Sequence, residues 1–195
     1  MKQDLPLTMA RRLLAPGPVV LVSAAWRGHA NIMTAAWAFP LSMEPPLVAV
    51  AVSPLRLTHD VIAASEEFAL NIPGVKLREK VHFCGMTSGR ERDKWREARL
   101  TPLPAKRIEA PLVEECLAHI ECGVEQAIAV GDHTLFVGRV LAVQAEEGCF
   151  DEMWLLEEDE AKPLHHLGLD RYAVLGGRTP PILPAEQGGE EEEED

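Results

Sequence analysis

The sequence predicts a mainly β fold, a single β-barrel with helical insertions. Several short apolar runs are bounded by Gly and Pro, which is typical of strands joined by turns. Residues 116–125 alternate between apolar and wetter positions with a period of two, and only a few segments have the pattern of helices. With 195 residues, the chain is long enough for one domain with a substantial core.

The first strands are expected before residue 53. Residues 18–26 form an apolar run, and the turn at residues 27–29 leads into a second strand at residues 31–40. The run Leu47–Val52 follows two prolines and is rich in β-branched residues. We expect it to be a strand that is buried on both faces.

A helix and a further strand are expected next. Thr58 is a good N-cap, which predicts a helix from residue 59 to about residue 65. Residues 68–72 form a short strand that Pro-Gly stops. Charged sequence from residue 76 to residue 99 is expected to be helical, and the proline-rich residues 100–111 are expected to form a loop.

A β-hairpin is expected in the second half of the chain. The alternating strand that begins near Cys116 is followed by a tight turn at Gly131-Asp132, and residues 134–144 return as its partner. From residue 179 onward, prolines, glycines and an acidic run predict disorder. The expected organisation is one domain at residues 1–178, followed by a disordered acidic tail at residues 179–195.

Charge and composition exclude several classes of partner. The formal net charge is −12, and half of it lies in the acidic run at residues 190–195. An acidic protein is not expected to bind nucleic acid or an anionic membrane. No stretch approaches the ~20 apolar residues of a membrane span. The first residues lack the charged-then-apolar order of a signal peptide, so we expect a cytoplasmic protein.

Cysteine and histidine spacing predicts no metal site. The cysteines form no C-x-x-C pair, and the histidines show no zinc-type spacing. Buried free thiols are the expected state, and the residues concerned are Cys84, Cys116, Cys122 and Cys149.

The expected strand at residues 31–40 is the most informative candidate for a binding site. Small residues leave its backbone uncovered, polar residues can hydrogen-bond, and one aromatic ring offers a flat face, whereas a strand built only for a core would favour Val, Ile and Leu. These features fit a planar ligand, and the alternative is a tightly packed strand in a sheet interface. The residues are Asn31, Thr34, Ala35, Ala36 and Trp37.

A phosphate site is predicted where the buried strand ends and the helix begins. The N-terminus of a helix presents free amides and the positive end of the helix dipole. Arg56 can add a charge-assisted contact, and the Ser53 and Thr58 hydroxyls can donate hydrogen bonds. Alternatively, Thr58 only caps its helix and Arg56 is solvated. There is no Walker loop and no G-x-G-x-x-G, so a nucleotide would be held in another way.

Two further segments are weaker candidates. Residues 88–95 are basic in an acidic protein and could reach an anion; the alternative is a solvated helix with local ion pairs, such as Asp93 with Arg96 or Lys94 with Glu97. His133, just past a tight turn, could contact a ligand at the rim of a barrel, or it could be a surface residue.

Taken together, these segments resemble the flavin reductase-like family of FMN-binding split barrels. The resemblance covers roughly residues 12–178 with the order of the motifs preserved, and it leaves out the acidic tail. The matching segments are residues 31–37, 47–52, Thr58, 68–72, 88–90 with 93–95, 131–138, 163–168 and 171–173.

The resemblance implies a six-stranded split β-barrel of Greek-key type that dimerises and holds FMN near the dimer interface. By this analogy residues 34–37 would follow the edge of the flavin ring, with Asn31 among the residues lining it. His133 would lie near the open face of the flavin, where a nicotinamide could stack. The phosphate would meet Ser53, Arg56, Thr58 and Lys94, and His166 falls where relatives place a further flavin contact.

Two functions follow from the resemblance. One is an NAD(P)H:flavin oxidoreductase, in which hydride passes to the flavin and the protein supplies orientation and charge. The other is a flavoredoxin-like electron-transfer protein that binds FMN firmly and is reduced by a protein partner. Neither needs a catalytic nucleophile or general acid, which fits the lack of a Ser-His-Asp or paired-carboxylate arrangement.

Overall fold

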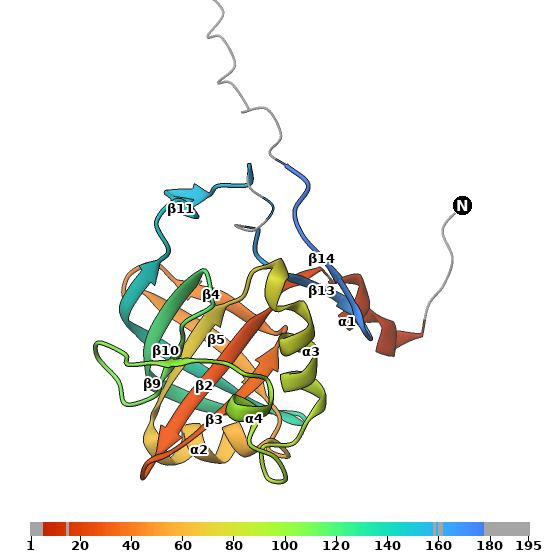
Figure 1. The fold of residues 1–195 in the computed structure, drawn as a ribbon. Coiled ribbons are helices and arrows are strands. Elements are labelled where there is room, and N and C mark those ends of the chain that lie inside the picture. The colour runs from red at the N-terminus through yellow and green to blue at the C-terminus, as the bar shows by residue number, and fades with distance from the viewer. Residues whose placement is uncertain (1–5, 15, 158, 160–161, 178–195) are drawn as a thin grey trace, which may run out of the picture.

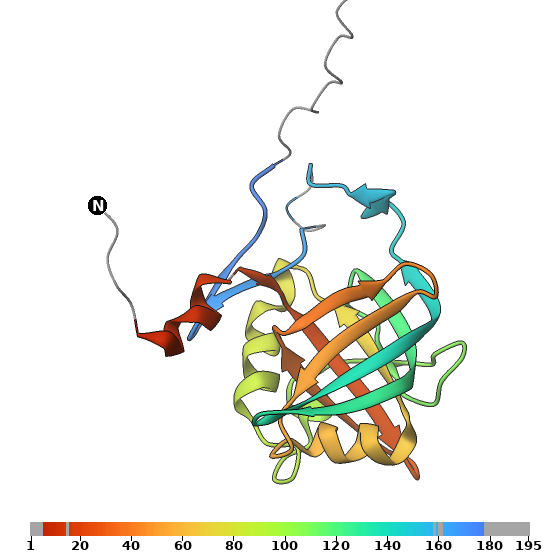
Figure 2. The ribbon, with the colours of Figure 1, turned by 180° about the vertical axis from the view of Figure 1, so that it is seen from behind.

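The computed structural model describes residues 6–14, 16–157, 159 and 162–177. The acidic tail predicted at residues 179–195 lies outside the described residues. The described part is mainly β, and its centre is an antiparallel sheet that curls on itself (Figures 1 and 2). Across the described residues this sheet has seven strands in the order β3-β2-β6-β9-β10-β5-β4. Their bounds are β2 Val20–Trp26, β3 His29–Ala35, β4 Ala38–Ser42, β5 Leu47–Val52, β6 Glu67–Ile72, β9 Ala118–Val130 and β10 His133–Ala145.

The predicted mainly β split-barrel class is confirmed, and the sheet has one strand more than the six expected. The run at residues 31–40, expected to be one strand, divides at Ala36 and Trp37. Its first half pairs with β2 at one edge of the sheet, and its second half pairs with β5 at the other edge. The carbonyl of Trp37 accepts a hydrogen bond of 2.9 Å from the amide of Ala51, which ties the crossing to β5. The chain itself therefore joins the two edges of the sheet.

Four α-helices are described, and three of them lie against this sheet: α2 Leu57–Ser65, α3 Arg78–Met86 and α4 Lys94–Glu97. The predicted N-cap was wrong: α2 begins at Leu57, its N-cap is Arg56, and no side chain caps it. The predicted helical stretch at residues 76–99 contains a 3-10 turn, Val75–Leu77, followed by α3 and α4, with residues 87–93 between the two helices. Asp93 caps α4, since its carboxylate accepts the backbone amide of Arg96 at 3.1 Å.

Two hydrophobic clusters hold these layers together. One fills the inside of the curled sheet and includes Val50, Phe68 and Phe136. The other lies between the sheet and the α3 side and includes Leu21 and Val81. Burial of this apolar surface is the main favourable term in folding. Consecutive residues of β5 are fully buried at Ala49 and Val50, in keeping with the prediction for that strand.

A polar network lies inside this fold around Asn71 of β6. Its amide nitrogen donates to Leu21 O at 2.8 Å and to Ser23 Oγ at 3.0 Å. Its amide oxygen accepts from the Val113 amide at 3.0 Å and from His119 Nδ1 at 2.9 Å. All the hydrogen-bonding positions of the side chain are therefore used inside the protein.

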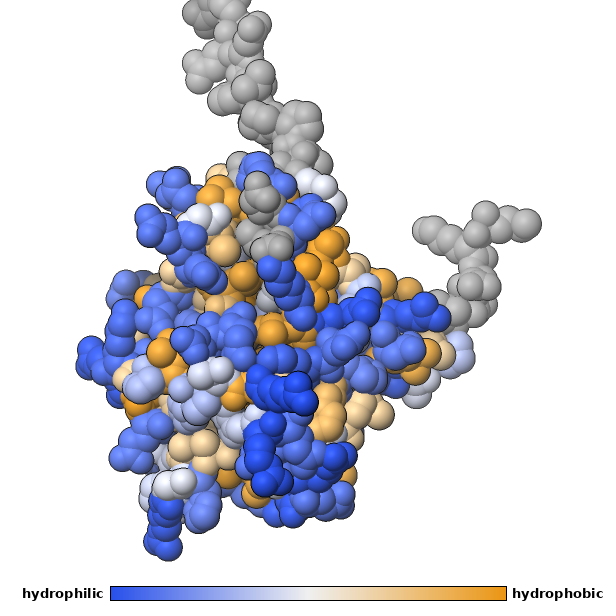
Figure 3. Space-filling view, in the orientation of Figure 1, coloured by the Kyte–Doolittle hydropathy of each residue, from blue (hydrophilic) through white to orange (hydrophobic). Residues whose placement is uncertain are grey.

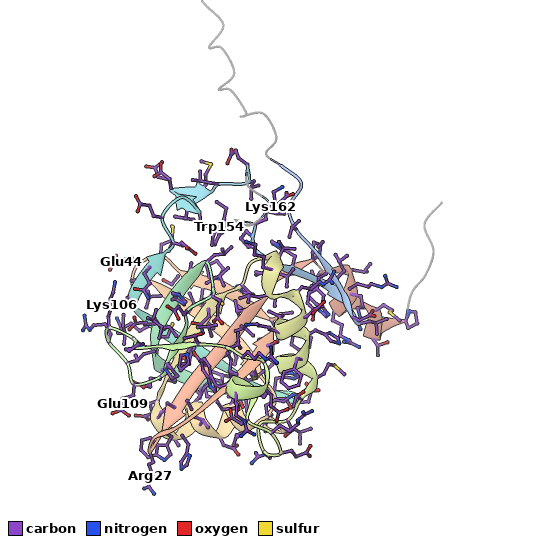
Figure 4. All side chains as sticks on the ribbon, viewed as in Figure 1. Arg27, Glu44, Lys106, Glu109, Trp154 and Lys162 are labelled. Atoms are coloured by element: carbon purple, nitrogen blue, oxygen red, sulfur yellow. The ribbon has the colours of Figure 1, made fainter. Side chains whose placement is uncertain are left out.

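Nearby carboxylates hold the long loop that follows α4. The buried carboxylate of Glu121 accepts the backbone amides of Lys106 and Arg107, at 3.0 Å and 2.7 Å. Glu67 accepts the amide of Glu109 at 2.6 Å. Figure 4 shows Lys106 and Glu109 on the outer side of the sheet. This loop also contains β7 Pro102–Leu103 and pairs it with β8 Leu112–Val113.

An arm built from both ends of the described chain lies beside α3. It contains α1 Ala10–Leu13, which follows a 3-10 turn at Leu7–Met9, together with β1 Gly17–Pro18, β13 His165–Gly168 and β14 Arg171–Ala173. The three strands form a small sheet of their own, in which β13 pairs with β1 on one side and with β14 on the other. Figures 1 and 2 both place α1 next to the β13–β14 hairpin. A two-stranded excursion, β11 Phe150–Asp151 and β12 Met153–Trp154, connects the barrel to the arm.

Two negative findings hold for the described residues. None of their helices is long and apolar enough to cross a membrane. No group of three or more His, Cys, Asp or Glu could hold a metal ion.

All four cysteines are free, and three of them, Cys84, Cys116 and Cys122, are buried as predicted. Burial raises the pKa of the Cys84 thiol to about 11, so it stays protonated near neutral pH.

Candidate functional site

A cleft of about 1080 Å³ opens where β3, β4, β5 and the starts of α2 and α4 meet the arm. Every residue that the sequence singled out as a site candidate lines it, although the segments concerned are spread over more than 130 positions. These residues are Asn31, Thr34, Ala35, Ala36, Trp37, Ser53, Arg56, Thr58, Lys94, His133 and His166. The fold therefore brings the predicted candidates together in one place.

The floor of the cleft is the crossing between β3 and β4. Ala35, Ala36 and Ala38 line it, and their short side chains leave the backbone close to the cleft. Trp37 stands between them with 44% of its surface exposed. Its ring lies 4.9 Å from the ring of His133, centroid to centroid, at an angle of 46°. The cleft thus has an open backbone floor with an aromatic pair at its edge.

Asn31 and Thr58 connect this floor to α2. The Asn31 amide nitrogen donates to Thr58 Oγ1 at 2.8 Å, and both residues are buried. This contact corrects the expected role of Thr58, because its hydroxyl bonds to a strand 27 residues away and not to its own helix. Gly89 lies directly against Asn31, and a Cβ on that glycine would overlap Asn31 Oδ1. Residue 89 must therefore be small for the loop to lie over Asn31.

The Thr34 side chain faces α3. Its hydroxyl donates to the carbonyl of Val81 at 2.5 Å. The donor that was expected to serve a ligand is therefore engaged with the protein, and Thr34 can offer the cleft only its backbone and the acceptor lone pairs of its hydroxyl. Gly85 packs on the same side chain, since a Cβ there would lie 3.3 Å from Thr34 Cβ.

Positive groups and free amides meet at the α2 end of the cleft. β5 ends at Val52, and residues 53–56 turn into α2, with the Arg56 amide donating to the Ser53 carbonyl at 3.0 Å. This turn leaves the first amides of a nine-residue helix at the cleft. The exposed Arg56 and the turn together form a site suited to an anion.

Lys94 is the other cation at this end, and it is only 4% exposed. Its ammonium group donates to the carbonyl of Cys84 at 3.1 Å, whereas Glu97, the partner in the alternative interpretation of this segment, pairs with Arg92. Burial is the main cause that lowers the pKa of Lys94 to about 8; the Cys84 thiol opposes the shift and Arg56 adds to it. A buried ammonium group without a carboxylate partner is expensive unless an anion joins it.

Two histidines also line the cleft. His133 Nδ1 lies 2.7 Å from the carboxylate of Asp132, which orients the ring over Trp37. His166 Nε2 lies 3.0 Å from the carbonyl of Leu169, and its ring is 5.4 Å from that of Tyr172. Both rings therefore have a partner in the protein that fixes their orientation.

The charge of the cleft is opposite to that of the chain. Among the described residues that line it there are four cationic side chains, Arg11, Arg12, Arg56 and Lys94, and no Asp or Glu. The whole chain has 31 acidic and 19 basic residues, so this composition sets the cleft apart. Sequence reasoning did not identify Arg11 and Arg12, because only the tertiary fold brings α1 to the cleft. An anionic ligand with a flat part is what such a cleft can bind.

Comparison with known proteins agrees with this geometry. The model of the flavin reductase like domain matches residues 10–166. The chain belongs to the flavin reductase-like family. The NADH-dependent flavin reductase StyB of Pseudomonas fluorescens is 33% identical over 137 residues, which cover 69% of this chain and 75% of that protein.

Solved structures of similar proteins have the same fold. The flavoredoxin of Desulfovibrio vulgaris (Miyazaki F) superposes with a TM-score of 0.81 at 30% identity, covering 97% of this chain and all of that one. An FMN-binding protein from Thermus thermophilus, with bound p-hydroxybenzaldehyde, superposes with a TM-score of 0.79 at 28% identity, covering 93% of this chain and 98% of that one. Proteins similar to this chain therefore include an FMN-binding protein.

Proposed function

We propose that this flavin reductase-like protein binds FMN in the cleft and is an NAD(P)H:flavin oxidoreductase. The observation that carries the proposal is the charge of the cleft. Although the chain is acidic, the charged side chains that line this cleft are all cations, and alanines leave the backbone of its floor uncovered. FMN has a flat ring, which matches the floor, and a phosphate at the end of a flexible chain, which matches the cations.

The residues present fit FMN. The phosphate would lie at the α2 end, where Arg56, Lys94 and the first amides of the helix meet, and the buried Lys94 would gain the anion that it lacks. The ring would lie on the floor formed by Ala35 and Ala36, with Trp37 at its edge. Gly89 and Asn31 also line the cleft, and they lie directly against each other.

In the proposed mechanism the protein would position the bound flavin and polarise its ring. Bound FMN would supply the hydride-accepting chemistry. The uncovered backbone of the β3–β4 crossing and the Asn31 amide offer fixed dipoles, which need no reorganisation when charge develops on a neighbouring ring. His133, oriented by Asp132, borders the open side of the floor, where a second planar ring could stack. No side chain needs to act as a nucleophile.

A second function is supported by a specific likeness. The flavoredoxin of D. vulgaris matches the full length of this fold at 30% identity. By this alternative the protein would carry electrons on firmly bound FMN, and a redox protein partner would reduce it. The oxidoreductase has its own support in the 33% identity to an NADH-dependent flavin reductase.

We also propose that the protein is a homodimer. Large apolar side chains are exposed around the cleft and on the arm, where Leu14 is 85% exposed and Phe39 is 45% exposed. Figure 3 shows apolar atoms on the α1 side of the molecule, while most of that face is hydrophilic. A two-fold partner would cover these residues and add a wall to the cleft. Sedimentation with and without FMN tests this; a monomer at micromolar concentration that holds FMN at full occupancy would contradict a shared site.

Steady-state oxidation of NADH and NADPH by the FMN-loaded protein decides between the two functions. An oxidoreductase turns over with one or both nucleotides at a rate that saturates with nucleotide concentration. An electron-transfer protein keeps its FMN oxidised under the same conditions and is reduced only when a partner reductase is added.

A further inference from the structure

Two arginines of α1 enter the cleft at an end that the FMN phosphate would not occupy. Arg11 and Arg12 line the cleft together with Gly17 of β1 and His166 of β13. Figures 1 and 2 show α1 beside the β13–β14 hairpin and away from α2 and α4. Because Arg56 precedes α2 and Lys94 begins α4, the cleft has cations at two separate ends.

Two glycines of the arm, Gly17 and Gly168, lie at the part of the cleft that Arg12 lines. Gly168 has a φ of +124°, which side chains rarely adopt, and the pairing of β13 with β14 shifts its register between His166 and Gly168. A Cβ on Gly168 would overlap the guanidinium of Arg12. Gly17 also lies close to the floor, since a Cβ there would be 3.0 Å from the carbonyl of Ala36. Arg12 thus occupies space that only glycine leaves open.

Neither arginine has a carboxylate partner within the part of the chain that the structure describes. This contrasts with Arg90, Arg92 and Arg139, which pair with Asp60, Glu97 and Glu125. In a chain with so many acidic residues, two adjacent unpaired guanidinium groups in a cleft without carboxylates are suited to an external anion.

We propose that Arg11 and Arg12 bind the pyrophosphate of the nicotinamide dinucleotide that reduces the flavin. This proposal rests on the proposed function. The phosphate of FMN is accounted for at the Arg56 and Lys94 end, so the arginines of the arm are available to a second ligand. A volume of about 1080 Å³ is at the upper limit of the usual range for a single small ligand. A dinucleotide whose nicotinamide stacks on the floor near His133 would direct its phosphates toward the arm.

The test compares FMN-loaded wild type with the double variant Arg11→Gln/Arg12→Gln. Arg27→Gln is the matched control, because Arg27 is an exposed arginine at the end of the molecule away from α1 (Figure 4). Binding is measured by calorimetry with ADP-ribose, which has the pyrophosphate and no nicotinamide. Anaerobic flavin bleaching is then followed with NADH, NADPH and 1-benzyl-1,4-dihydronicotinamide, a hydride donor without phosphate.

We expect the double variant to bind ADP-ribose about tenfold to a hundredfold more weakly, and the NADH concentration for half-maximal bleaching to rise by a similar factor. The limiting rate, the rate with the phosphate-free donor and the FMN affinity should stay near the wild-type values, and Arg27→Gln should match wild type throughout. The double variant Arg11→Lys/Arg12→Lys should recover part of the affinity, because it keeps the charge but not the guanidinium geometry.

Several outcomes would overturn the proposal. An equal loss with the phosphate-free donor would mean that the arm only supports the fold. A loss for NADPH alone would assign the arginines to the 2′-phosphate, and an unchanged affinity for ADP-ribose in the double variant would refute the pyrophosphate subsite. If wild type reacts only with the phosphate-free donor, the proposed oxidoreductase fails; ADP-ribose binding that depends on the arginines would still support the subsite, and its absence would refute it.

Discussion

The chain has only two asparagines, and they serve in opposite ways. Asn71, fully buried in β6, uses its amide in four hydrogen bonds within the protein. Asn31, which is 7% exposed at the cleft, makes one side-chain hydrogen bond within the described residues, to Thr58. Both stand on strands that pair with β2, and both bridge distant segments. They differ in how much hydrogen-bonding capacity remains for a ligand.

This difference separates groups that support structure from groups available to a ligand. A saturated buried amide contributes to stability, because removing it leaves several partners unsatisfied. A partly used amide in a cleft contributes less to stability and keeps donors and acceptors oriented for something else. The same distinction applies to the cations, since Arg139 is paired with Glu125, whereas Lys94 has only a carbonyl.

The largest expected effect is that of Asn71→Ala on stability. The substitution leaves the Val113 amide and His119 Nδ1 without their acceptor inside the protein. We expect the free energy of unfolding to fall by about 3–5 kcal/mol, as measured by urea denaturation. FMN affinity of the fraction that remains folded should be close to that of wild type. A loss below 1 kcal/mol would show that the network is not what holds these strands.

The next effect concerns the phosphate end of the cleft. Arg56→Ala combined with Lys94→Ala should weaken FMN binding by on the order of 3 kcal/mol, since each charge-assisted contact contributes about 1.5–3 and solvent screening offsets part of it. Riboflavin, which lacks the phosphate, serves as the control ligand and should bind almost unchanged. Equal losses for the two ligands would indicate damage to the fold.

The buried network should also make stability depend on pH. Burial lowers the pKa of His119 to about 4, while the nearby Glu121 carboxylate opposes this shift. The unfolded chain takes up this proton below about pH 6.5, and the native protein does not until about pH 4. The free energy of unfolding should therefore fall by roughly 3 kcal/mol as the pH falls from about 6.5 to about 4. Above pH 6.5, His119 should not make the free energy of unfolding depend on pH.

The matched variant for that test is His119→Gln, which keeps a donor near Asn71. Its unfolding free energy, measured by urea denaturation at pH 4.5 and pH 7, should change less with pH than that of wild type. Identical pH profiles for the two proteins would mean that another group titrates.

A smaller effect is expected on the cleft side of the comparison. Asn31→Ala should weaken FMN binding by about 1–2 kcal/mol and lower the free energy of unfolding by about 1 kcal/mol or less. Gly89→Ala should act in the same direction on binding, because its Cβ would displace Asn31. Glu91→Ala, an exposed position of the same loop that does not line the cleft, is the control. The comparison fails if Asn31→Ala destabilises the protein as much as Asn71→Ala does.

Much of this fold could be predicted from local sequence. Period-two alternation and β-branched runs define β5 and the β9–β10 hairpin to within a few residues. The division at Ala36 and Trp37 could not be predicted, because no Gly or Pro marks it and alanine fits either state. The start of α2 was misjudged because Thr58 is a good local cap whose hydroxyl is engaged by a residue far away in sequence.

The candidate site was predictable where the segments themselves suggest chemistry. Small residues on a strand indicate a flat ligand, and a helix start beside an arginine indicates a phosphate. The arm was not predictable in this way. Arg12 reaches the cleft because β1 pairs with β13, about 150 residues later, and because Gly168 adopts a positive φ. Such placements depend on long-range contacts that a local pattern does not encode.

The most direct test of the central claim is a calorimetric titration of the flavin-free protein with FMN and with riboflavin. The proposed site predicts one FMN per chain, with riboflavin weaker by on the order of 3 kcal/mol because it lacks the phosphate. FMN affinity should also fall as the pH rises past about 8, since burial lowers the pKa of Lys94 to about 8 and the neutral amine no longer attracts the phosphate. Absence of FMN binding, or equal affinity for the two flavins at every pH, would contradict the account.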